Sequence, residues 1–276
     1  MPTAAPSITQ ITNLSHLYLL SPLHTGGTTQ EGNLLGIARE AHTEFPYLPS
    51  STIRGRLRAS VFTDQGQDIC YRLFGNEITD QRESLTQGSI WVGDGSILWF
   101  PIASLSHGVL WVSCPMLLRR WSTYQSEKPP IPNAYATNLN NSNQICLKDV
   151  ILQKSDLILW SDWKKFIPKG SETESIERVL VLPDKYFATV VQMGLWRQVK
   201  VKLDEHKTVK DGSFRYEEAI PPDAVMYFPW GVTTQRKSEQ STLTEEFQDI
   251  LNSYSILQIG GQESLGRGFV QQWSVN

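Results

Sequence analysis

The chain of 276 residues is poor in the residue types that build metal sites and disulfide frameworks. Its three cysteines, Cys70, Cys114 and Cys146, are odd in number and form no Cys-x-x-Cys pair, which argues against a disulfide scaffold and a zinc knuckle. The five histidines show no metal-ligand spacing either. We therefore expect no metal site of its own, and thiols that behave as small core residues in a reducing compartment.

Long apolar runs are also missing. No stretch approaches the ~20 residues that a helix needs to cross a bilayer. The first residues, Met1 to Pro6, lack the basic start and apolar core of a signal peptide. These absences predict a cytoplasmic protein without a membrane partner.

Positive charge is not in excess. Lysine and arginine number 25 and aspartate and glutamate 28, so the net charge is −3 with histidine neutral. A protein that binds nucleic acid over its whole surface is usually basic, so any such site here must be local. With 40% hydrophobic residues the chain is long enough to bury a sizeable core.

A glycine-rich stretch near the C-terminus, residues 259–270, is the most distinctive feature that is present. Glycine permits φ > 0 and close approach of a backbone to a ligand. Arg267 stands among these glycines and can pair with a phosphate through two N–H groups. A tight turn between two strands explains the pattern equally well. The glycines are Gly260, Gly261, Gly266 and Gly268.

A second glycine loop follows the first predicted strand, residues 14–23. It begins at His24 and contains Gly26 and Gly27. Such loops offer backbone N–H groups to anions. The P-loop pattern is absent because no Gly-Lys-Ser/Thr follows, and a simple connecting loop is the alternative.

A basic helix is predicted next. Pro49 followed by Ser50 and Ser51 is a good helix start, and Arg54 and Arg58 lie one turn apart near that start. Because a helix N-terminus itself favours anions, we expect a phosphate contact here, with a solvated basic face as the alternative. The buried stripe of this helix is Ile53, Leu57 and Val61.

Residues 195–218 have the alternation of a β-hairpin with one basic face. Trp196 stands at the start of the segment, and Lys200 and Lys202 then alternate with valines. A polar turn follows, and Phe214 and Tyr216 alternate with polar residues on the return strand. Such a hairpin can pack on a neighbouring subunit or wedge into nucleic acid by stacking. An ordinary sheet edge whose lysines prevent aggregation is the alternative.

The remaining segments complete an α+β pattern. A capping box at Thr242 to Glu245 predicts the start of a second helix. Together with the elements above, the order fits a ferredoxin-like βαββαβ core with long insertions. We expect strands at 109–112, 179–182, 186–192, 224–230, 256–259 and 269–273, a helix at 115–124, and a loop or mobile insertion at 125–146.

Several motifs, in this order along the chain, resemble the RAMP superfamily of CRISPR proteins. They include residues 20–26, Arg39-Glu40, residues 46–55, 73–75, 94–101, 112–115, 216–221 and the glycine stretch 260–268. The resemblance is closest to the repeated backbone subunit of the type III-B effector, the Cmr complex.

The resemblance implies a single RRM-like palm over residues 1–276, with residues 195–218 as a protruding thumb. Such subunits stack along a guide RNA (crRNA), and their thumbs enter the guide–target duplex at regular intervals. The implied partners are guide and target RNA, further copies of the chain, and other effector subunits. The implied guide contacts are His24, Gly26, Gly27, Arg39, Ser50, Ser51, Arg54, Arg58, Gly260, Gly261, Gly266, Arg267 and Gly268.

The resemblance also implies cleavage of target RNA by an aspartate that lies shortly before Arg39 in the chain and acts beside Mg²⁺. Here the aligned position falls at Leu34 or Asn33, and Glu31 is the only carboxylate nearby. We therefore predict a guide-binding structural subunit that holds no cofactor tightly. An active, Mg²⁺-dependent endoribonuclease that uses Glu31 and cuts at regular intervals is the alternative.

Overall fold

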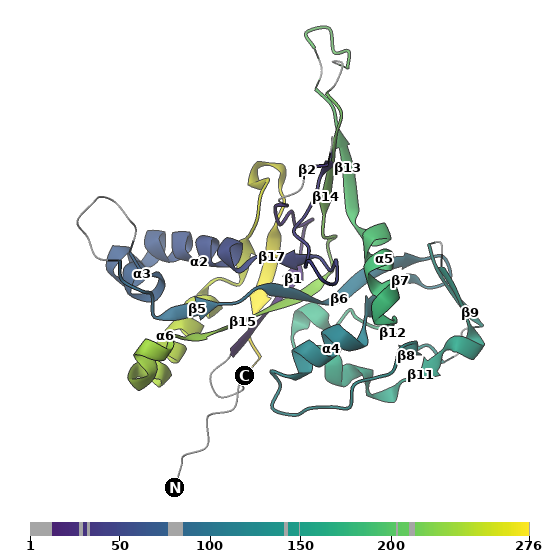
Figure 1. Cartoon of the computed structure of the whole chain (residues 1–276), viewed down its shortest axis with the longest axis horizontal. Helices are drawn as coiled ribbons and strands as arrows, with labels where there is room; N and C mark the ends of the chain where they lie inside the picture. The colour runs from purple at the N-terminus through teal and green to yellow at the C-terminus, as the bar shows by residue number, and fades with distance from the viewer. Residues whose placement is uncertain are drawn as a thin grey trace.

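A computed structural model describes residues 13–27, 30–31, 34–76, 85–140, 143–148, 150–202, 204–209 and 213–275. The molecule is elongated, with a sheet through its middle and a narrow hairpin that rises from it (Figure 1). Part of the predicted loop that begins at His24, including Asn33, lies outside the described residues.

The centre of the fold is β1 (Asn13–Leu19), which pairs antiparallel with β15 (Val225–Val232) and with β17 (Phe269–Trp273). The next strand out, β6 (Gly95–Ser104), pairs antiparallel with β15. Helix α2 (Ser50–Gln65) connects β1 to β6 along the chain, and α6 (Gln240–Ser253) connects β15 to β17. The order β6-β15-β1-β17 is that of a ferredoxin-like βαββαβ sheet, and the predicted α+β palm is confirmed.

Alternation along the central strands builds one core on each face of the sheet. Leu17 and Leu19 enter the first core, whereas Tyr18 packs against the second. Helices α2, α3 (Gln67–Phe74), α5 (Asp184–Gly194) and α6 contribute to the first core. Helix α4 (Pro115–Ser122) and the 3-10 helix η2 (Ser161–Phe166) contribute to the second, which is rich in tryptophan.

Long insertions widen the sheet beyond β6. The strands β7 (Gly108–Ser113), β12 (Val179–Val181), β8 (Ala136–Thr137) and β11 (Ile158–Leu159) follow one another to that edge, and β16 (Ile256–Gln258) forms the other edge. The shorter strands are β4 (Tyr47–Leu48), β5 (Ile90–Val92), β9 (Gln144–Leu147) and β10 (Val150–Gln153). The remaining 3-10 helices are η1 (Lys154–Asp156), η3 (Ser171–Thr173), η4 (Thr234–Glu239) and η5 (Glu263–Leu265).

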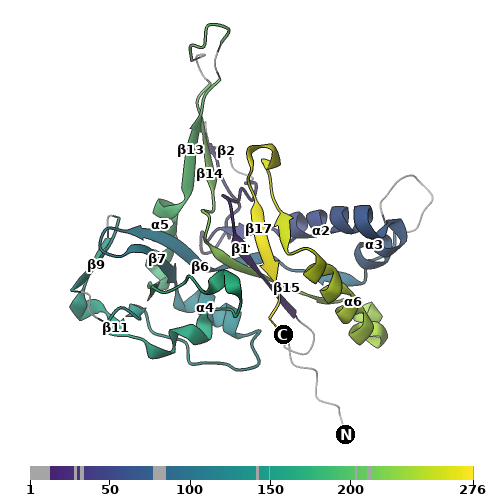
Figure 2. The same cartoon turned by 180° about the vertical axis from the view of Figure 1, so that it is seen from behind.

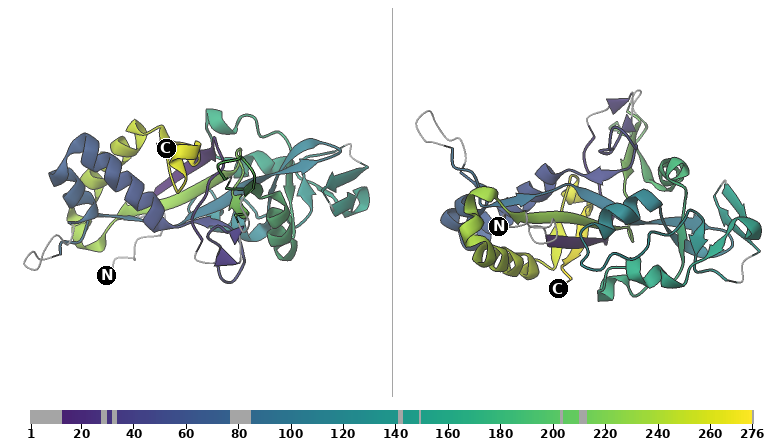
Figure 3. Two further views of the ribbon diagram at one scale, coloured as in Figure 1. Left: turned by 90° about the horizontal axis from the view of Figure 1, so that it is seen from above. Right: turned by 60° about the horizontal axis from the view of Figure 1, so that its bottom comes forward.

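The predicted hairpin is present and stands on its own small sheet. We call β13 (Trp196–Lys200) and β14 (Arg215–Ala219) the thumb hairpin; they pair antiparallel. β14 also pairs with β3 (Leu34–Leu35), which pairs with β2 (Gln30–Glu31). The hairpin projects away from the C-terminus (Figures 1 and 2), and it lies near the middle of the palm when seen from above (Figure 3).

Three predictions of local structure need correction. Residues 186–192, expected as a strand, lie in α5, because Phe187, Val190 and Val191 are spaced to bury one helical face. The insertion 125–146, expected as a loop, contains β8 and the start of β9. Helix α6 begins at Gln240, before the predicted capping box at Thr242.

A membrane span is not found in the described part of the chain, where no helix is both long and apolar enough to cross a bilayer.

Candidate nucleic-acid interface

The two predicted glycine loops meet. Gly261 N donates to His24 O at 3.1 Å, and Gly268 N donates to Pro22 O at 3.0 Å. Gly260 has φ +85°, and a Cβ there would lie 2.5 Å from His24 O; at Gly268, with φ +73°, it would lie 1.9 Å from Ile259 O. At both positions the group that approaches closely is the chain's own backbone, so contact of these glycines with a ligand stays a prediction.

His24 links this loop pair to the base of the thumb hairpin. Its side chain is 5% exposed, and Nδ1 lies 2.9 Å from Glu218 O in β14. Since a carbonyl only accepts, Nδ1 carries the proton in this contact. His24 therefore holds its own loop against the thumb hairpin, and most of its ring is out of solvent.

Arg267, the charged residue of the glycine stretch, faces the thumb hairpin. Its guanidinium lies over the Trp196 ring, 4.0 Å from the centroid, and Nη2 donates to Gln198 Oε1 at 2.5 Å. Nη1 lies 3.8 Å from Glu217 Oε2, and the side chain is only 5% exposed. In this conformation its contacts are with the thumb, and little of its surface is open to a phosphate.

Arg39 occupies a similar position on the other side of the hairpin. Its Nη2 donates to Glu218 Oε2 at 3.0 Å, while Glu218 Oε1 accepts from Arg197 Nε at 3.0 Å and from Gln192 Nε2 at 3.2 Å. The Glu218 side chain is 2% exposed. Buried carboxylates are stable when they are paired and hydrogen-bonded in this way.

The thumb base therefore collects more positive than negative charge. Glu217 also pairs with Lys200 Nζ at 2.6 Å. With Arg39, Arg197 and Arg267, four cations surround the two carboxylates Glu217 and Glu218. The thumb base is therefore locally positive on a protein of net charge −3.

The arginines of α2 pack on the neighbouring helix α3. Arg54 lies over the Phe74 ring, 5.7 Å from its centroid, and donates to Phe74 O; Arg58 lies over the Tyr71 ring at 5.8 Å. Burial, together with the nearby charge of Arg58, lowers the pKa of the Arg54 guanidinium. The contacts described for these two side chains are therefore with α3, away from the glycine loops.

The start of α2 already has an anionic partner. Neither Ser50 nor Ser51 caps the helix with its hydroxyl; instead Ser50 N donates to Asp94 Oδ1 at 2.6 Å. A carboxylate thus sits where we expected a phosphate, and it satisfies the same N-terminal dipole.

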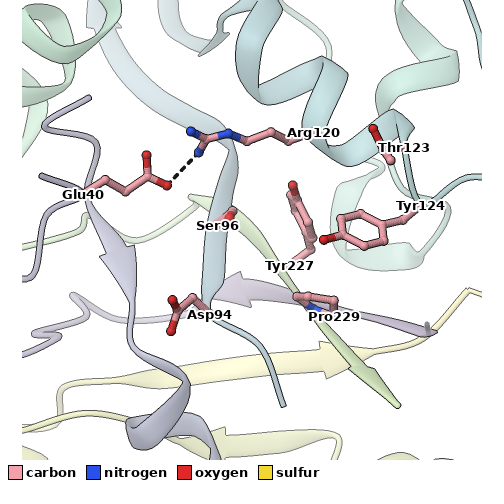
Figure 4. Close-up of a pocket in the computed structure, with 8 residues that line it drawn as sticks. All are labelled: Glu40, Asp94, Ser96, Arg120, Thr123, Tyr124, Tyr227 and Pro229. Carbon is pink, nitrogen blue, oxygen red and sulfur yellow. Dashed lines mark hydrogen bonds and ion pairs between the residues drawn. The ribbon is translucent and has the colours of Figure 1, made fainter. Parts of the chain in front are cut away.

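A pocket of about 400 Å³ lies beside Asp94, on the second face of the sheet (Figure 4). Arg120 Nη1 pairs there with Glu40 Oε1 at 2.6 Å, and the rings of Tyr124 and Tyr227 meet edge to face at 6.2 Å. Burial raises the pKa of the Tyr227 hydroxyl above its usual range. Two carboxylates against one arginine make the lining net negative, which disfavours a phosphate backbone.

The outer part of the thumb hairpin presents apolar rings to solvent. Phe214 is 46% and Tyr216 47% exposed; Lys202, two residues beyond β13 and opposite Ser213, is also exposed. Exposed rings are suited to stacking on bases. Trp196, by contrast, lies at the hairpin base under Arg267.

The candidate catalytic carboxylate, Glu31, lies in β2, so its backbone belongs to the thumb sheet. Leu34, at the position aligned with the expected aspartate, lies in β3. Within the described ranges no group of three histidine, cysteine, aspartate or glutamate side chains is placed to hold a metal ion.

Sequence reasoning missed Glu217, Glu218 and Gln198 as members of this site. A signal was present: two adjacent carboxylates directly before the apolar Ala219 and Ile220, at the end of a strand. In a strand, adjacent side chains point to opposite faces, so at least one of such a pair must face the protein.

Comparisons with known proteins agree with this architecture. A family model described as the RAMP superfamily matches residues 16–271. The CRISPR system Cmr endoribonuclease Cmr4 of Pyrococcus furiosus is 29% identical to this chain, over 92% of each sequence.

Two solved structures share the fold. A crystal structure of oligomeric Cmr4 from Pyrococcus furiosus has a TM-score of 0.69 and 24% identity, and covers 96% of this chain and 99% of that one. A chain of the type III-B Cmr-beta complex bound to cognate target RNA has a TM-score of 0.74 and 17% identity, and covers 95% of this chain and 96% of its own.

Proposed function

The chain belongs to the RAMP superfamily, and we propose that it is a backbone subunit of a type III-B CRISPR ribonucleoprotein. In this role it binds guide RNA, assembles with further copies of itself along that RNA and with other effector subunits, and shapes the guide–target duplex with its thumb hairpin.

The observation that carries this proposal is the extent of the family match. Residues 16–271 include all of β15, most of β1 and of β17, the two glycine loops and the whole thumb hairpin. A match restricted to the palm would support only an RNA-binding fold. The relative that is 29% identical over 92% of the chain is a Cmr subunit, which supports the same role.

RNA contact is proposed at the surface formed by the loop at Gly26 and Gly27, the glycine stretch around Gly266, and the exposed hairpin residues Lys202 and Tyr216. Gly26 and Gly266 both adopt positive φ, with open space where a Cβ would stand. Backbone N–H groups in such turns bind anions without reading sequence. Sequence specificity is then supplied by base pairing with the guide.

A structural role without target cleavage is the form of the proposal that the residues favour. The stretch before Arg39 has no aspartate where the family resemblance implies the cleaving carboxylate. The relative's designation as an endoribonuclease supports the alternative, cleavage with Glu31 and Mg²⁺.

Reconstitution with guide RNA tests both forms. Native mass spectrometry of the chain with a guide should show several copies on one RNA, with affinity that falls steeply with salt. Absence of salt-sensitive binding would overturn the RNA-binding role. Lys202→Gln should weaken binding relative to Lys128→Gln, a matched exposed lysine away from the thumb.

Cleavage is tested on the assembled complex with guide-matched RNA and Mg²⁺. We expect intact target RNA. Regularly spaced cuts that persist in the wild type and disappear in Glu31→Gln would establish the endoribonuclease in place of the purely structural subunit.

A further inference from the structure

The thumb hairpin is held from both of its faces by one palm arginine each. In the antiparallel register Gln198 lies opposite Glu217, and Arg197 lies opposite Glu218. Directly opposed residues share a face, and neighbours along a strand face opposite ways. Glu217 and Glu218 therefore present their carboxylates to opposite sides of the hairpin.

The face that carries Trp196, Gln198 and Glu217 meets Arg267. Three separate contacts converge on this one guanidinium: the ring below it at 4.0 Å, the amide oxygen at 2.5 Å and the carboxylate at 3.8 Å. All three partners belong to the thumb, whereas Arg267 belongs to the glycine stretch of the palm. Stacking on a ring, a hydrogen bond to an amide oxygen and an ion pair can be made together by the planar guanidinium of arginine.

The opposite face, with Arg197 and Glu218, meets Arg39. The Arg39–Glu218 pair measures 3.0 Å, and the carboxylate is 2% exposed. Gln192 in α5 donates to the same carboxylate, so a palm helix joins this side of the contact. Both arginines thus come from palm loops, and both of their carboxylates come from β14.

We infer that Arg267 and Arg39 are positioning residues that fix the angle of the thumb hairpin on the palm, and that they do not contact guide phosphates. The inference rests on the proposed function, in which the thumb shapes the duplex. It changes the role of both arginines, which the sequence motifs place among the guide contacts. Each guanidinium already faces a buried carboxylate of β14, so a phosphate would have to compete with that partner for it.

The two roles predict different responses to Arg267→Gln. A lost phosphate contact lowers the slope of log Kd against log salt by about 0.7 for single-stranded RNA. A lost positioning contact leaves that slope and the guide affinity unchanged within twofold. It instead accelerates amide hydrogen exchange in residues 196–200 and 215–219 at least tenfold. The matched control is Arg215→Gln, an exposed arginine on the same hairpin.

Conservative variants separate positioning from a charge effect. Arg267→Lys keeps the positive charge and loses the fork, so it should exchange as fast as Arg267→Gln. Glu217→Gln removes only one of the three Arg267 contacts, so it should accelerate exchange less than Arg267→Gln does. The double variant Arg267→Gln/Glu217→Gln should add little to Arg267→Gln, because that variant has already lost the Arg267–Glu217 pair. A slope reduced by about 0.7 in Arg267→Gln and restored in Arg267→Lys would overturn the inference.

In the assembled complex, base unstacking in the target RNA reports whether the thumb hairpin is correctly placed, which hydrogen exchange alone does not measure. A target RNA with 2-aminopurine at successive positions reports where bases unstack. Wild type and Arg215→Gln should give the same regularly placed fluorescence maxima, while Arg267→Gln and Arg39→Gln reduce them at least twofold at unchanged guide affinity. Unaltered maxima in both variants would refute the positioning role. If wild type binds no guide RNA, the proposed function fails, and the exchange measurement still decides whether Arg267 fixes the hairpin.

Discussion

A buried histidine makes the stability of this protein depend on pH in a way that can be measured. His16 lies in β1, 2% exposed, with its ring stacked on Trp273 at 5.5 Å. Trp121 Nε1 donates to His16 Nε2 at 3.3 Å, so Nε2 must be an acceptor and the ring must be neutral. Burial lowers the pKa of His16 from 6.5 to about 4.

The sign follows from where the proton binds. Below pH 6.5 the unfolded chain protonates His16 while the folded chain does not, so the unfolded state binds more protons and stability falls with falling pH. The full difference, from 6.5 to about 4, corresponds to about 3 kcal/mol. At pH 5 the expected loss from this one group is about 2 kcal/mol relative to pH 7.5.

Urea unfolding at a series of pH values between 7.5 and 5 measures this effect. His16→Gln removes the titration but keeps an oxygen that can accept from Trp121, so its unfolding free energy should fall by about 2 kcal/mol less than that of wild type. His206→Gln, at a histidine 79% exposed on the thumb, is the control and should follow wild type. Parallel pH profiles for wild type and His16→Gln would refute the reasoning.

Three further predictions concern single positions. Gly268→Ala places a Cβ 1.9 Å from Ile259 O at φ +73°, and urea unfolding should show a loss of at least about 2 kcal/mol. Gly55→Ala, exposed in α2 with nothing within 4 Å of the new Cβ, should stabilise by about 0.5–1 kcal/mol in the same assay; a loss would contradict this account. Burial raises the pKa of the Cys114 thiol to about 12, so mass spectrometry after iodoacetamide treatment at pH 8 should show the less buried Cys146 alkylated first, and the reverse order would contradict the assigned burial.

Local periodicity was sufficient to predict the elements that position the site. Ile53, Leu57 and Val61 are each 0% exposed, as their spacing predicts for the buried stripe of α2. Period-2 alternation likewise identified the thumb hairpin. These signals depend only on neighbours in the chain, because one buried face imposes one period on the sequence.

The errors in predicted secondary structure arose where one short segment fits both the strand period and the helix period, or where the segment is too short to show a period. Residues 186–192 contain the β-branched run Thr189-Val190-Val191, which favours a strand, yet Phe187 with Val190 and Val191 also fits a helical face. The two-residue strands β2 and β3 carry no pattern of their own. β2 pairs with β3, and β3 pairs with β14, which is distant in the chain, so this small sheet is set by tertiary packing.

The binding partner of an arginine is harder to predict from sequence than the element that carries it, because a positive charge can pair with a carboxylate of the protein or with a phosphate. Arg267 is 69 residues from Gln198 in the chain, yet that amide and Glu217 bind its guanidinium in the fold. The side chain is 5% exposed; Nη2 donates to Gln198, whereas Nη1 makes no hydrogen bond and lies 3.8 Å from the Glu217 carboxylate, whose charge offsets part of the cost of burial. A phosphate could therefore take Arg267 only by separating it from Trp196, Gln198 and Glu217 together. The glycine stretch is better understood as the palm's attachment to the thumb. Its turn at Gly266, and the turn at Gly26 in the loop that begins at His24, have open space where a Cβ would stand.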